Sequence, residues 1–229
     1  MAEDLLSLSK KFVIATKAND VSATACVEAL ATYDIGKLPL ELNTDHKKIA
    51  FWVNIYNGMT HYILSANPKL FESRSDFFKA DLISIGGKIM SLDFIEHGLL
   101  RRSKNKLSLG YLGKLKVSPF EKEHRVDKVD WRIHYALNCG AKTCPPVIPY
   151  TATHLDKELD ESTQKYLDKH CKWLEGRKKL EIPVLFRWFQ NDFGGKKGVK
   201  GILRKYNIIS EGENPALSYG DYDWTLYLD

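Results

Sequence analysis

The feature that most constrains the fold is a long helical pattern of apolar residues between Asp45 and Ala66. These residues follow the 3.6-residue spacing of a helix that buries one face. They are Ile49, Trp52, Val53, Tyr56, Ile63 and Leu64. Asp45 is the predicted N-cap, and Asn67-Pro68 ends the pattern because the residue before a proline avoids helical geometry. We expect this helix to be the central helix of the core.

Shorter patterns on both sides predict a mainly helical α+β chain with a small antiparallel sheet or hairpin. Further helices are predicted over residues 5–15, 21–33, 91–102, 153–174, 185–192 and 199–206. Asp20 and Ser91 are the expected caps of two of them, and Thr153 with Asp156 resembles a capping box. Two short apolar arms around Gly86-Gly87 predict a hairpin with a two-residue turn.

The remaining segments are less regular. Residues 132–137 alternate in polarity, which favours a buried strand over a helix. Residues 180–185 are predicted as a short strand, and Pro183 suggests that it lies at a sheet edge. Irregular or extended chain is predicted over residues 103–130, with one short element, and over 139–149 and 219–228.

Composition limits the classes of partner. Hydrophobic residues make up 44% and charged residues 28% of the 229 residues, which is ordinary for a globular protein. The net charge is +5, and the most basic stretch, Lys104 to Lys116, is interpreted as a solvated loop. We therefore expect no nucleic-acid binding.

No apolar run reaches the length of a membrane span, and the acidic start at Glu3-Asp4 is unlike a signal peptide. A cytoplasmic location is therefore expected unless a leader has been removed.

The most informative segment for chemistry is the loop that holds Cys139 and Cys144. Core cysteines usually lie on helices or strands, whereas this loop is shaped by glycine and prolines. Gly140 allows the Cys139 sulfur to be exposed and brings backbone N–H groups close enough to stabilise a thiolate or an oxyanion. Lys142 could lower the pKa of the thiol further. Cys139 is preferred as the nucleophile because Cys144 is stiffened by Pro145-Pro146.

A cysteine nucleophile needs a base, and the base needs a group that orients it. His97 is the predicted general base because it lies on a largely apolar helix and can face a cleft. Groups that could orient its imidazole are Asn54, Asn57 and Asp93. Predicted substrate-binding residues are Glu96, Arg132, His134, Lys142 and Cys144, with Arg132 or Lys142 holding an acidic group.

Structural explanations exist for the same residues. His97 and His134 could be buried histidines without a catalytic role, and Cys139 and Cys144 could form a disulfide. Zinc bound by His134, Cys139 and Cys144 is a third option, but no second ligand pair follows in the sequence. We predict neither a metal nor another cofactor.

Five segments resemble motifs of the DUF547 family, in the same order along the chain. Residues 51–57 resemble F-W-x-N-x-Y-N, residues 91–101 resemble S-L-x-x-I-E-H-x-I-L-R, residues 132–146 resemble R-I-H-F-A-L-N-C-G-A-K-S-C-P-P, residues 186–194 resemble W-F-x-x-D-F-G, and residues 222–226 resemble Y-D-W-S-L. Thr143 and Thr225 replace serines, and the tail continues as Tyr227-Leu228-Asp229 in place of the usual asparagine. The resemblance implies one domain over residues 1–229, with residues 1–44 as a helical lead-in and 45–228 as the family core.

The resemblance names no activity, so two hypotheses about function stay open. The first is a thiol hydrolase or acyl transferase of the papain or transglutaminase type, which acts on a small molecule or peptide and could share that fold. Its histidine would precede its cysteine, which reverses the usual papain order and would require permutation or convergence. The second is a non-catalytic binding or scaffold module for a protein partner, in which the cysteine loop is structural or disulfide-bonded.

Overall fold

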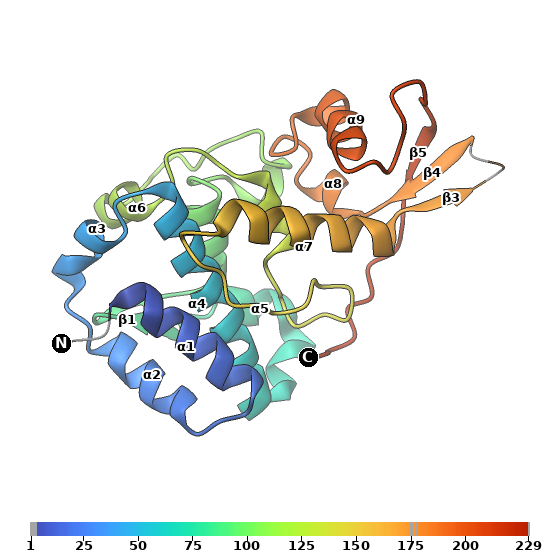
Figure 1. Cartoon of the computed structure of the whole chain (residues 1–229). Coiled ribbons are helices and arrows are strands. Elements are labelled where there is room, and N and C mark those ends of the chain that lie inside the picture. Colours follow the sequence, from blue (N-terminus) through green and yellow to red (C-terminus); the bar gives the residue numbers. More distant parts are fainter. Residues whose placement is uncertain (1–3, 175, 177, 229) are drawn as a thin grey trace.

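The structure is a computed structural model that describes residues 4–174, 176 and 178–228 (Figure 1). The first half of the chain forms α1 (Leu5–Lys17), α2 (Ser22–Ala31), η1 (Ile35–Lys37), α3 (Leu38–Glu41), α4 (Asp45–Ala66), η2 (Pro68–Ser73), α5 (Arg74–Lys79), β1 (Ile83–Ile85), β2 (Lys88–Met90), η3 (Phe94–Leu100) and η4 (Lys106–Ser108). The second half forms α6 (Pro119–His124), η5 (Trp131–Tyr135), α7 (Leu155–His170), β3 (Lys172–Leu174), β4 (Lys179–Ile182), α8 (Leu185–Trp188), α9 (Gly195–Lys205) and β5 (Ala216–Tyr219).

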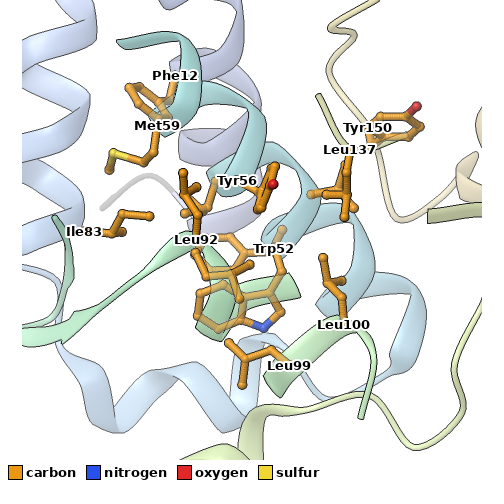
Figure 2. Packing of buried hydrophobic residues seen from close by; sticks show 14 of the residues in the cluster. Phe12, Trp52, Tyr56, Met59, Ile83, Leu92, Leu99, Leu100, Leu137 and Tyr150 are labelled. Atoms are coloured by element: carbon orange, nitrogen blue, oxygen red, sulfur yellow. The ribbon is translucent and has the colours of Figure 1, made fainter. Parts of the chain in front are cut away.

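The prediction of a central helix over Asp45–Ala66 is confirmed by α4. Its residues are buried almost continuously from Ile49 to His61, and α1 packs along it. Figure 2 shows Trp52 of α4 close to Leu99 of η3, in the middle of the larger core. The predicted cap is wrong by one residue: the Thr44 hydroxyl accepts the N–H of Lys47, while the Asp45 carboxylate accepts two backbone N–H groups from residues 127 and 128.

The predicted hairpin is also confirmed. β1 and β2 pair antiparallel, with Ile83 opposite Met90. Gly86 and Gly87 form the turn with positive φ angles of 55° and 75°, a conformation that only glycine adopts without strain at both positions. The turn N–H groups donate to carbonyls at the end of α2, which fixes the hairpin to the helical layer.

A second core cluster lies between α7, α8, α9 and a small sheet. β4 is the middle strand of this sheet, antiparallel to β3 and parallel to β5 (Figure 1). The predicted edge position is therefore wrong, because Pro183 directly follows the last residue of β4 and its missing N–H removes no ladder bond. The fold is α+β, and nothing in its two small sheets supports the papain- or transglutaminase-like arrangement.

Two local predictions fail because distant partners outweigh the local pattern. Residues 132–137 are not a strand: η5 is a 3₁₀ turn capped by Asp130, whose carboxylate accepts the N–H of Arg132 at 2.9 Å. Ile133 and Tyr135 are both buried because they enter different core clusters. The capping box of α7 does not form either, since the Asp156 carboxylate binds the Arg132 guanidinium. This helix ends at His170, and the rest of the predicted helix becomes β3.

The chain after β5 confirms the predicted extended tail. It descends from the small sheet and ends near α5 (Figure 1), where Arg74 lies over the Trp224 ring at 5.0 Å. Along this path the tail pairs with the cysteine loop through a bridge between Ala141 and Leu226. The tail therefore covers the loop that holds the candidate nucleophile. In the described part of the chain, no helix has the length and apolar character needed to cross a bilayer.

Candidate functional site

Several sequence-predicted residues meet at a cavity of about 430 Å³. Its apolar wall includes Leu137, Leu185, Trp188, Phe189, Tyr222 and Trp224. Its polar side chains include Asp93, Glu96, His97, Lys106, His134 and Cys139. The residues lie on or beside α4, α5, η3, η4, η5 and α8 and in the cysteine loop and the tail, so only the tertiary structure assembles them.

A π-helix positions Glu96 and His97. The Ser91 hydroxyl accepts the N–H of Phe94 at 3.1 Å, which confirms the predicted cap. The next turns are wide: the Arg101 N–H donates to the carbonyl of Glu96, five residues earlier. Such π-turns occur frequently at functional sites because they redirect side chains that an α-helix would place elsewhere.

His97 is held as a neutral hydrogen-bond donor. Its Nδ1 lies 2.9 Å from Nη1 of Arg101, and a guanidinium only donates, so Nδ1 accepts and the proton lies on Nε2. Nε2 is 3.7 Å from Oδ1 of Asp93. Burial, followed by the charge of Arg101, lowers the His97 pKa to about 3. In this arrangement neither nitrogen is free to accept a proton.

In His134 the acceptor nitrogen is the one left free, whereas in His97 the donor nitrogen is left free. Its Nε2 donates to Oδ2 of Asp192 at 3.0 Å, and the same oxygen accepts Nε of Arg101 at 2.6 Å. Phe189 stacks on the His134 ring at 3.9 Å, and the Arg101 guanidinium also lies over Phe189. Burial lowers the His134 pKa, so the imidazole is neutral and its Nδ1 is the acceptor nitrogen. The described residues place no hydrogen-bond donor on that nitrogen.

Arg101 and Asp192 were missed as site residues by the sequence analysis. Both side chains are fully buried, and together they connect the two histidines. A signal was present, because Arg101 ends one of the family-like motifs and Asp192 lies inside another. A charged residue in such a motif needs a buried partner, and here each is the partner of the other.

The two loop cysteines are not joined by a disulfide in this structure and form a close pair. Their sulfurs are 2.8 Å apart, and the Cys139 N–H also donates to the Cys144 sulfur at 3.1 Å. The hydroxyl of Tyr222 is 3.1 Å from the Cys144 sulfur. The contact with Cys144 and burial raise the Cys139 pKa, whereas burial of Cys144 is outweighed by hydrogen bonds that lower its pKa. The Cys144 sulfur therefore accepts the backbone N–H of Cys139, and the two sulfurs lie close enough to exchange a proton.

Asn138 and Asn57 hold the shape of the cysteine loop. Oδ1 of Asn138 accepts the N–H of Gly140 at 2.8 Å, and its Nδ2 donates to the carbonyl of Pro145. Oδ1 of Asn57 accepts the N–H of Asn138 at 2.7 Å. The Gly140 N–H is therefore occupied and is not a free oxyanion donor, in contrast to the expectation. Asn57 anchors the loop and does not touch His97.

Besides Asn57 and Cys144, the predicted site residues that lie outside the cavity lining are Asn54, Arg132 and Lys142. Asn54 is fully buried and bonds both backbone groups of Tyr150, so it joins α4 to a distant segment and does not orient His97. Arg132 is occupied by three carboxylates, those of Asp130, Asp156 and Asp160. Lys142 is exposed and lies 3.6 Å from Asp223. These contacts give structural roles to all three residues and do not support the roles assigned from sequence.

Among the described residues, no group of three His, Cys, Asp or Glu side chains is arranged to hold a metal ion. A comparison with family models matches residues 39–167, more than half of the chain, to "Protein of unknown function, DUF547". The searches of curated proteins and of solved structures found no match.

Proposed function

Because the chain belongs to the DUF547 family, whose description names no activity, we propose from the geometry of the cavity that it is a cysteine-dependent hydrolase or acyl transferase. One observation carries the proposal: the Cys139 thiol and two neutral, hydrogen-bonded histidines line the same largely apolar cavity. Exclusion of water from such a cavity strengthens each polar interaction with a reacting group.

The contacts support a division of roles that differs from the one expected from sequence. The Cys139 sulfur attacks the carbonyl carbon of the substrate, and its proton passes to the neighbouring sulfur of Cys144, which acts in this step as a thiolate. The Nε2–H of His97 donates to the carbonyl oxygen as negative charge develops there. The leaving group takes that proton from Cys144 and departs, which leaves a thioester on Cys139 and restores the Cys144 thiolate.

His134 serves the second step. Its Nδ1 removes a proton from water or from an amine, which then attacks the thioester and releases the acyl group from Cys139. Asp192 orients His134 and stabilises the positive charge that forms on the ring, as the carboxylate does in other histidine-based triads. Asp93 is held by Lys106 and lies near the donor nitrogen of His97.

The test is acyl transfer to Cys139. Purified, reduced protein is incubated with small acyl thioesters and p-nitrophenyl esters, and adducts are located by mass spectrometry. We expect an adduct on Cys139 that is lost in Cys139→Ala, slowed in His97→Gln, and long-lived in His134→Gln. Cys171→Ala is the matched control, because this thiol is outside the cavity and burial raises its pKa to about 12. Absence of any Cys139 adduct, with reaction of the unfolded chain, would overturn the proposal.

A specific observation also favours the second candidate, a binding module with a structural cysteine loop. The two sulfurs of the loop lie close together. The backbone N–H groups of Lys142 and Thr143 donate to carbonyls of the tail, so the loop holds residues 223–226 in place. In that case mass spectrometry of unreduced protein would find Cys139 joined to Cys144. The acyl probes would then stay unreactive after reduction.

A further inference from the structure

The charges of the side chains that line the cavity do not cancel. Both oxygens of Asp93 accept Nζ of Lys106 at 2.8 Å. Glu96 is the third charged side chain of the lining, and no Lys or Arg among the described residues forms an ion pair with it. Because the two histidines are neutral, the lining has one more negative than positive side chain.

Glu96 also lacks a strong hydrogen-bond donor. Its Oε2 is 3.5 Å from the hydroxyl of Tyr56, which is a long contact for an O–H donor. Its Oε1 is 3.5 Å from Nδ1 of His97, but that nitrogen accepts from Arg101 and has no proton to give. The Glu96 side chain is only 14% exposed, so water replaces these partners poorly. A carboxylate that is mostly buried with only one long hydrogen bond is costly, and a cationic ligand would remove that cost.

The rest of the lining defines the body of such a ligand. Trp188, Tyr222 and Trp224 form a cluster of rings on one side, with ring centroids 4.6–5.9 Å apart. Rings of this kind favour flat apolar groups and cations. The volume of about 430 Å³ lies within the range of sites for small molecules.

We propose that the cavity binds an amine with an apolar body, whose ammonium group pairs with Glu96 while the body packs on the rings of Trp188 and Trp224. The site accepts the amine in its protonated form. Resting on the proposed function, this deepens it: the ammonium is the part of the substrate that fixes its orientation in the cavity. Glu96, next to the donor His97, then determines specificity for the ligand.

The test is a binding measurement that needs no catalysis. The probes are 2-phenylethylammonium and its neutral analogue 2-phenylethanol, and the readout is the fluorescence of the cavity tryptophans with calorimetry as a second method. We expect the ammonium to bind at least about tenfold more tightly than the alcohol, as for one charge-assisted bond. Glu96→Gln removes this preference, whereas Glu161→Gln, the same change on the exposed face of α7, keeps it.

Each outcome is informative. Equal binding of the two probes to wild type, no binding of either at millimolar concentration, or an unchanged preference in folded Glu96→Gln would overturn the proposal. The comparison of the two probes on wild-type protein tests amine binding even if Glu96→Gln does not fold. Cys139→Ala is expected to bind the ammonium like wild type. Amine binding without acylation of Cys139 would therefore leave this inference standing and remove the hydrolase proposal, and acylation without amine binding would do the reverse.

Discussion

Replacement of Asp192 by Asn tests whether the buried charge pair holds the site together. The carboxylate and the guanidinium of Arg101 are both fully buried, and one oxygen of Asp192 accepts both Nε of Arg101 and Nε2 of His134. An amide keeps the size of the side chain but leaves the Arg101 charge without its partner. Breaking a buried pair in this way costs about 3–5 kcal/mol, a large part of the ~5–15 kcal/mol by which a domain is stable.

The assay is urea unfolding followed by circular dichroism, with thermal melts beside it. For a chain of this size, such a loss lowers the melting temperature by about 6–20 °C. Glu161→Gln is the matched control, since its partner Lys157 is exposed and 3.9 Å away, and we expect its melting temperature to stay close to wild type.

A double variant separates the charge from the packing. Arg101→Met with Asp192→Leu removes both charges, so we expect a smaller loss of stability than in Asp192→Asn alone. If Asp192→Asn costs less than about 1 kcal/mol, or if the double variant costs the sum of the two single changes, the pair is not the stabilising unit that the geometry indicates.

Three further predictions follow from other parts of the fold. Gly58→Ala places a Cβ 2.5 Å from the buried Phe12 ring and should cost about 1–3 kcal/mol in urea unfolding, whereas Gly201→Ala meets nothing and should be neutral or stabilising. Gly140→Ala should destabilise the cysteine loop, seen as faster amide exchange there, because φ is +87° and Leu64 is 2.8 Å from the new Cβ. The lowered His97 pKa predicts that this residue makes the protein less stable as the pH is lowered from 6.5 to about 3, by up to ~1.4 kcal/mol per pH unit, because only the unfolded chain takes the proton. Unfolding of His97→Gln over the same pH range should show a slope that is smaller by this contribution, since burial also lowers the pKa of His134.

Elements whose signals are local in the chain could be predicted from the sequence. The central helix follows from its own apolar spacing, the hairpin from Gly86-Gly87, and the start of the π-helix from the Ser91 hydroxyl. The cysteine loop was expected to be irregular for the same reason, since glycine and proline act on their immediate neighbours. The domain boundaries over residues 1–229 stay a prediction.

The site could be predicted only in part. Cys139, His97, Glu96, Asp93 and His134 line one cavity, as a candidate site requires. Their roles depended on partners that the sequence analysis did not identify. The tautomer of His97 is set by Arg101, a neighbour one turn away. The roles of Cys139 as nucleophile and His134 as base stay proposals until acylation is measured.

What the sequence determined by itself was the central helix, the hairpin and the residues able to do chemistry, because helical spacing and turn glycines act over a few residues. What only the tertiary structure decided was which polar groups meet. Asp192 reaches His134 across 58 residues, and Tyr222 reaches Cys144 across 78. It also turned the predicted strand at 132–137 into η5, since the capping bond from Asp130 and burial in two clusters outweighed a short alternating pattern. Burial explains both results, because polar groups that lose water must find partners wherever the fold brings them.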